Sequence, residues 1–101
     1  MIITDTTQNP AVNTTINLKD LGSFANGRVD CAQVLLTGTV TAGTVKLIFS
    51  QDNINFYPLT DDYGAQLALT PHVPLYLKFA NIYIKCDLEG VEGQDIKVQV
   101  Q

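Results

Sequence analysis

Residues 43–64 read GTVKLIFSQDNINFYPLTDDYG and contain, in order, a strand pattern, a polar turn, an aromatic segment and a second turn. Val45, Leu47 and Phe49 alternate with Thr44, Lys46 and Ser50, with Ile48 as the exception. This period of two is typical of a β-strand with one buried face. The Ser, Asp and Asn residues that follow are those that let a chain reverse between strands. The same polar residues beside Phe56-Tyr57 could also hold a metal or a sugar. We interpret them as serving backbone geometry first.

The rest of the chain repeats this organisation, with short β-rich runs separated by turn residues. The runs are TTINL (14–18), RVDCAQVLLTG (28–38), GTVKLIFS (43–50), INFYPL (54–59), AQLALT (65–70), PLYLKF (74–79), NIYIKCDL (81–88) and DIKVQVQ (95–101). No window of helical length keeps a 3.6-residue apolar period, and only LKDLGSF (18–24) suggests a helical turn. The sequence predicts an all-β fold, a single small two-sheet β-sandwich, jelly-roll or immunoglobulin-like, with seven to eight short strands.

The apolar phase changes within residues 74–88. Apolar residues occupy odd positions up to Phe79 and even positions from Ile82 onward. Because a strand cannot keep one face buried through such a slip, we expect a bulge or a turn at Ala80-Asn81.

The domain organisation follows from length and from the composition of the first residues. A chain of 101 residues is long enough for one domain with a single core. Residues 1–15, MIITDTTQNPAVNTT, are rich in Thr and Asn and predict an N-terminal arm, with the sandwich in residues 16–101. We expect deletion of residues 1–12 to leave the sandwich folded, because the arm has few apolar residues.

Charge and composition restrict the possible partners. The chain has 6 Lys and Arg against 10 Asp and Glu, a net charge of −4, and its basic residues are scattered, so nucleic acid is not an expected partner. The chain shows neither a signal-peptide pattern nor an apolar run of membrane length, so we expect a soluble protein with no membrane partner. Cys31 and Cys86 match no metal spacing; we expect inward-facing reduced thiols, with one disulfide between the sheets as the alternative.

Catalytic chemistry has little support in the sequence. His72 is the only histidine and lies between two prolines in TPHVP (70–74), where we expect a solvated loop side chain. Nucleophile-elbow, zinc-protease, P-loop and dinucleotide motifs are all missing. We therefore expect no enzymatic activity, no catalytic residues and no cofactor.

Two groups of polar residues could bind a ligand. Calcium could be held by the carboxylates of either acidic group, but neither matches the twelve-residue calcium loop, so solvated turns are the preferred interpretation. These groups are Asp52, Asp61 and Asp62, and Asp87, Glu89, Glu92 and Asp95. A sugar could stack on exposed aromatic rings beside amides, although burial of the rings is the simpler account. That possible ligand surface consists of Asn53, Asn55, Tyr57 and Tyr63.

The order of turns and strands resembles that of small bacteriophage virion proteins, over about residues 34–101. The matching residues are Gly38-Thr39, Gly43-Thr44-Val45, Ser50, Asp52-Asn53, Phe56-Tyr57-Pro58-Leu59 and NIYIKCDL (81–88) with Gly90 and Gly93. Two positions depart from the pattern: Asn53 stands where Gly is frequent, and Phe56-Tyr57 where a Trp is common. Asn tolerates a left-handed backbone and Phe still fills a core, so the fold tolerates both changes.

The resemblance implies a non-enzymatic virion structural protein, a capsid decoration or accessory subunit assembled in the host cytoplasm and located in the virion. Its partners would be itself, as a homotrimer, and the major capsid protein or another virion protein. We expect the interface to use the arm and the apolar run around residue 35, which places apolar side chains on both strand faces. These interface residues are Ile2, Ile3, Val12, Val34 and Leu36. The alternatives are a carbohydrate-binding or adhesion module and a monomeric immunoglobulin-like module of a larger surface protein.

Overall fold

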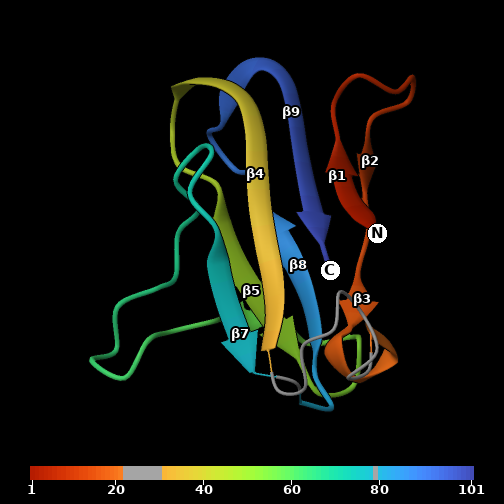
Figure 1. Ribbon diagram of the computed structural model, residues 1–101, viewed down its shortest axis with the longest axis vertical. Coiled ribbons are helices and arrows are strands. Elements are labelled where there is room, and N and C mark those ends of the chain that lie inside the picture. The colour runs from red at the N-terminus through yellow and green to blue at the C-terminus, as the bar shows by residue number, and fades with distance from the viewer. Residues whose placement is uncertain (22–30, 79) are drawn as a thin grey trace.

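The computed structural model describes residues 1–21, 31–78 and 80–101, and its strands form two antiparallel sheets packed face to face (Figure 1). The five-stranded sheet has the order β2 (Val12–Asn13), β1 (Ile2–Asp5), β9 (Glu92–Val100), β4 (Cys31–Ala42) and β7 (Leu75–Lys78). The four-stranded sheet has the order β3 (Ile16–Asn17), β8 (Tyr83–Asp87), β5 (Lys46–Ser50) and β6 (Tyr57–Pro58). A 3-10 turn, η1, spans Leu18–Leu21. The predicted all-β two-sheet sandwich is confirmed.

The described part of the chain contains nine strands rather than seven or eight, because β1 and β2 precede the first predicted run, 14–18, whereas one other predicted strand does not form. The N-terminal residues supply three short strands, β1 to β3. Residues 65–70 were expected to form a strand but make only isolated bridges, Lys46 with Ala68 and Thr60 with Gln66. The run expected at 54–59 is reduced to β6, because the preceding turn extends to Asn55.

The core lies between the sheets and is built from alternating strand residues. In β9, Ile96, Val98 and Val100 are buried while the residues between them are exposed, as the alternation predicts. The buried apolar residues are Ile3, Ile16, Leu18, Ala32, Val34, Leu36, Val45, Leu47, Leu69, Ile84, Cys86, Ile96, Val98 and Val100. These residues come from both sheets and from the N-terminal segment, so one core unites the described chain.

The N-terminal segment is part of the sandwich, which corrects the prediction of a separate arm over residues 1–15. β1 pairs with β9, and Ile3 is 0% exposed in the core. The Met1 ammonium donates to the Val100 carbonyl at 2.9 Å, which places the two termini close together (Figure 1). Buried Thr4 and Asp5 keep hydrogen-bond partners in Asn13 and Thr7, so a polar strand can be buried here.

The expected interface residues are divided between the core and the surface. Ile3, Val34 and Leu36 are wholly buried, so the prediction that they form an interface is wrong. Ile2 is exposed, and Val12 is half-buried in the edge strand β2. The reason is strand alternation, which sends every second residue of β4 inward and leaves only Leu35 of the apolar run on the outer face.

The phase change in residues 74–88 marks the passage of the chain from one sheet to the other. β7 belongs to the five-stranded sheet and β8 to the four-stranded sheet, and residues 80–82 lie between them outside any strand. The break predicted at Ala80-Asn81 is therefore confirmed. Phe79, the turn expected at Asn26-Gly27, and residues 28–30 of the predicted run 28–38 lie outside the described residues.

The two cysteines are free thiols that lie in different sheets. Cys86 faces the core in β8 and is buried, as predicted, and burial raises the pKa of its thiol to about 11. Cys31 is half-buried at the start of β4 and has the phase of the outward residues Gln33 and Leu35, so the prediction that it faces inward is wrong. Within the described residues, no helix has the length and apolar character needed to cross a membrane.

Candidate functional site

A depression of about 350 Å³ lies at the end of the four-stranded sheet, beside its edge strand β6. It is lined by Phe49, Gln51, Asp52, Asn55 and Tyr57. The volume is at the lower end of the roughly 300–1,000 Å³ that small-molecule sites occupy. The lining combines two aromatic rings with amide and carboxylate groups.

Strand register brings the two aromatic rings together. Phe49 of β5 is directly opposite Tyr57 of β6, so both side chains share one face of the sheet. The ring centroids are 6.2 Å apart, with an angle of 50° between the ring planes. Among the described strands, β6 is the edge of this sheet, and Tyr57 on it is 58% exposed. The lip of the depression is therefore a large and accessible aromatic surface.

The polar side of the depression is a turn organised by the Asp52 carboxylate. Asp52 Oδ1 accepts hydrogen bonds from the Ser50 hydroxyl at 2.7 Å and from the backbone amides of Ile54 and Asn55, each at 2.9 Å. Asp52 Oδ2 accepts a bond from Asn55 Nδ2 at 2.9 Å. Asn53 has a φ of 61°, a left-handed conformation that Asn tolerates. The prediction that these polar residues serve backbone geometry is confirmed.

The Asp52 carboxylate is held in its ionised form. Backbone hydrogen bonds from Asn55 and Ile54, with side-chain bonds from Ser50 and Asn55, lower the pKa of Asp52 far below its ordinary value. Oδ1 makes three hydrogen bonds within the turn, so its acceptor capacity is used by the fold. Asp52 thus fixes the shape of the depression and places a negative charge at its wall at neutral pH.

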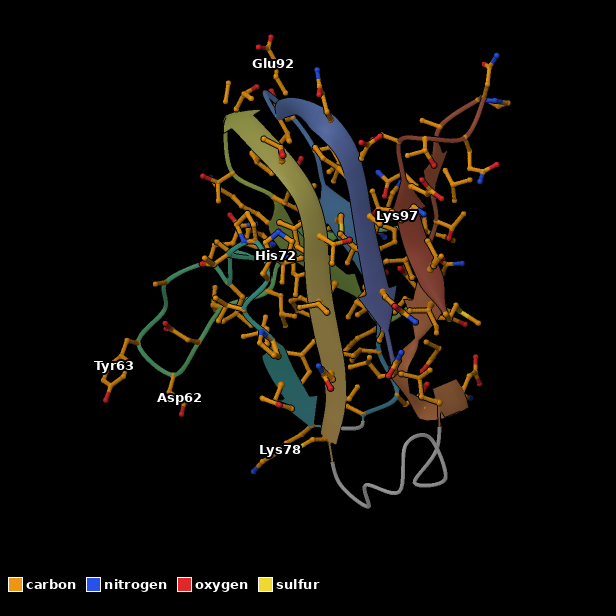
Figure 2. The ribbon with its side chains drawn as sticks, turned by 45° about the horizontal axis from the view of Figure 1, so that its top comes forward. Asp62, Tyr63, His72, Lys78, Glu92 and Lys97 are labelled. Atoms are coloured by element: carbon orange, nitrogen blue, oxygen red, sulfur yellow. The ribbon has the colours of Figure 1, made fainter. Side chains whose placement is uncertain are left out.

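The structure brings together only part of the ligand surface predicted from the sequence. Asn55 and Tyr57 line the depression, whereas Asn53 does not. Tyr63 is 96% exposed and lies with Asp62 at the tip of the loop between β6 and β7, pointing away from the sandwich (Figure 2). The prediction of one surface containing all four residues is therefore wrong.

Phe49 and Gln51 line the depression, but sequence analysis did not include them in the ligand surface. Phe49 was read as a core residue from the alternation of β5, and it does pack against the core while remaining half-buried. The sequence did hold one sign that Phe49 could be accessible: it is the last residue of the alternating apolar series in its strand and is followed by a short edge strand. Gln51 gave no signal of its own.

A second accessible surface covers the outward side of the five-stranded sheet. Register places Gln33 opposite Tyr76 and Leu35 opposite Gln99, and Ile2 is also opposite Gln99. Gln33 and Gln101 exchange backbone hydrogen bonds of 2.8 and 2.9 Å, which continues the pairing to the end of β9. We name this surface the outer sheet face; it consists of Ile2, Gln33, Leu35, Tyr76, Gln99 and Gln101.

The outer sheet face is uncharged, and charged residues lie around it. Lys97 lies two residues before Gln99 on the same side of β9, Lys78 ends β7 on the side of Tyr76, and Glu92 lies at the distant hairpin end of β9 (Figure 2). Ile2 is 45% exposed and Tyr76 is 51% exposed. Apolar and amide groups, which avoid the cost of desolvating charges, are thus grouped together on this part of the sheet.

The other predicted chemical groups do not assemble. The His72 side chain is exposed, while its backbone amide donates to the Leu36 carbonyl at 2.8 Å, consistent with the predicted loop histidine. Asp61 Oδ1 accepts hydrogen bonds from the backbone amides of Tyr63 and Ala65 and so stabilises the turn in which it lies. Across residues 1–21, 31–78 and 80–101, no three His, Cys, Asp or Glu side chains gather as a metal site.

Comparison of the chain with protein-family models, with curated proteins and with solved structures found no match.

Proposed function

We propose that this protein is a non-enzymatic structural subunit of a bacteriophage particle, a capsid decoration or accessory protein that acts by association. The observation that supports this function is the outer sheet face, whose six side chains are uncharged and come from β1, β4 and β7 and from the C-terminal end of β9. The resemblance of residues 34–101 to small virion proteins supports the choice of a phage particle. We propose this face as the contact between copies in place of the N-terminal arm that the sequence predicted, because Ile3 and its strand belong to the core.

Charge supports the outer sheet face as the contact between copies. Each copy has a net charge of −4, and a contact surface without acidic groups keeps the like charges of two copies away from the contact. Glu92 and Asp95 are exposed in the hairpin half of β9, beyond this face. A Leu, an Ile and a Tyr side chain supply apolar area, and each Gln side chain can both donate and accept a hydrogen bond across a contact.

The proposed assembly is a homotrimer with closed cyclic symmetry, which leaves no contact surface open for further growth. The major capsid protein or another virion protein is its proposed partner. The loops at residues 51–55 and 59–66 stay outside this contact and remain accessible in the assembly.

The proposed location is tested by mass spectrometry of gradient-purified particles from the phage source that encodes the chain. We expect peptides of this protein in the particle band, at a fixed ratio to the major capsid protein across independent preparations. Its absence from particles in lysates that contain the protein would contradict the virion assignment. Location of its gene away from capsid and tail genes would weigh against it as well.

A carbohydrate-binding or adhesion module is the second candidate function, and the depression beside Phe49 and Tyr57 favours it. This depression lies in the sheet opposite to the outer sheet face, so the two functions depend on different residues.

A further inference from the structure

We propose that the depression lined by Phe49, Gln51, Asp52, Asn55 and Tyr57 binds a neutral sugar ring. The site is independent of the proposed assembly contact, because its residues belong to β5, β6 and the turn between them. The proposal rests on three features of the depression: an exposed aromatic ring, polar groups that the fold leaves unused, and a rigid wall. Each feature corresponds to a property of a sugar.

The aromatic ring supplies the apolar contact. A sugar ring presents C–H groups on one face, and such a face is covered well by the flat surface of a Tyr side chain. Tyr57 is 58% exposed although the interior of the sandwich lies beside it, and its neighbour Phe49 packs against the core. Phe49 therefore supports the Tyr57 ring from the core side, while the Tyr57 ring remains accessible from solvent.

The unused polar groups supply the hydrogen bonds. Within the described part of the chain, the Gln51 side-chain amide, Asn55 Oδ1 and the Tyr57 hydroxyl take part in no intramolecular hydrogen bond. Together they offer both donors and acceptors around one opening, which suits hydroxyl groups that donate and accept at once. The Asn55 amide nitrogen is held by Asp52 Oδ2, so Asn55 Oδ1 has a fixed position.

The rigid wall limits the cost of binding and selects against anions. Asp52 is fixed by hydrogen bonds from Ser50, Ile54 and Asn55, so the turn is already in place before a ligand arrives. Its carboxylate stays ionised and repels acidic sugars and phosphates. A neutral ring with several hydroxyls is the ligand class that meets all three conditions.

The test is a titration of the ¹⁵N-labelled protein with neutral monosaccharides and disaccharides of glucose, galactose, mannose and N-acetylglucosamine, followed by amide chemical shifts. We expect shifts confined to residues 49–57 with one of these sugars, and a dissociation constant in the millimolar range, which corresponds to about −4 kcal/mol. A peptide rich in proline serves as a competing class of ligand. Binding of that peptide, with no response to any sugar up to tens of millimolar, would overturn the proposal.

Variants separate the site from unspecific contacts. Tyr57→Ala removes the stacking ring, and we expect binding of the active sugar to weaken at least about tenfold. Tyr63→Ala is the matched control, because it removes a tyrosine that is 96% exposed on another loop, and we expect unchanged binding. Gln51→Ala removes a side chain that the fold does not use and should weaken binding without altering the unfolding transition. Equal binding by wild type and Tyr57→Ala would also overturn the proposal.

Discussion

Strand β1 should be required for stability, and Ile3→Ala is the substitution that measures its contribution. Ile3 is 0% exposed between the sheets, and neighbouring residue Ile2 is 45% exposed on the outer sheet face. Truncation of a fully buried Ile to Ala removes its transfer free energy and leaves a cavity, at a cost of about 2–5 kcal/mol. Truncation of Ile2 leaves no internal cavity and should cost below about 1 kcal/mol.

The assay is urea unfolding followed by far-ultraviolet circular dichroism, because the chain has no tryptophan. It is run at a dilution at which light scattering shows monomers, so that association does not add to the stability. A domain of this size has a free energy of unfolding of roughly 5–15 kcal/mol, and a loss of 2–5 kcal/mol is therefore easily measured. The melting temperature should fall by roughly 4–8 °C for each kcal/mol lost.

Ile2→Ala is the matched control, since it removes the same side chain from the adjacent position. A cost below about 1 kcal/mol for Ile3→Ala, or equal costs for the two substitutions, would refute the burial of β1 in the core. Deletion of residues 1–5 extends the test, because it uncovers the edge of β9 and the core beneath it. We expect that deletion to abolish cooperative unfolding, contrary to the sequence-based expectation that the sandwich stays folded without residues 1–12.

Three further predictions follow from other parts of the fold. In the native protein a thiol reagent should modify half-buried Cys31 rapidly and Cys86 only after denaturation, since burial raises the pKa of Cys86 to about 11; two fast thiols would contradict this. Gly38→Ala should lower the free energy of unfolding at least twice as much as Gly64→Ala, which should cost about 1–2 kcal/mol. Both positions need a positive φ, but of the two only a Cβ at Gly38 overlaps a backbone carbonyl. Equal losses of unfolding free energy in urea would contradict this overlap. The fold lowers the pKa of Asp52, so the ionised Asp52 carboxylate stabilises the folded protein above the ordinary Asp pKa of about 3.9, and this contribution decreases as the pH falls below that value. The Asp52→Asn variant should therefore lose less unfolding free energy on acidification than wild type. Equal losses would count against the hydrogen-bonded turn.

Local patterns predicted those parts of the fold that depend on near neighbours. The alternation in β9 places Ile96, Val98 and Val100 in the core, and the phase change near Ala80 marks the passage between sheets. The polar turn after Ser50 was also predictable, since Asp side chains bind backbone amides two and three residues onward. These features depend on residues adjacent in the sequence.

Long-range pairing explains what the sequence did not predict. Residues 1–15 are polar enough to resemble an arm, and Ile3 becomes buried only because β1 pairs with β9, more than ninety residues away. The burial of Thr4 depends on a hydrogen bond to Asn13 of the short strand β2. In the depression, Phe49 lies opposite Tyr57 because of the register between β5 and β6. That register depends on the length of the turn between them, which the sequence alone does not define.

The self-association of the chain through the outer sheet face is tested most directly by sedimentation velocity over a range of concentrations. We predict that wild type forms a trimer and that Leu35→Lys is a folded monomer, because it places like charges in the contact between copies. Gln99→Lys, at an exposed site opposite Leu35, should act in the same way. Thr44→Lys adds the same charge at an exposed site outside this face and should leave the trimer intact. A wild-type protein that stays monomeric at high micromolar concentration, or a Leu35→Lys variant that still forms trimers, would contradict the account.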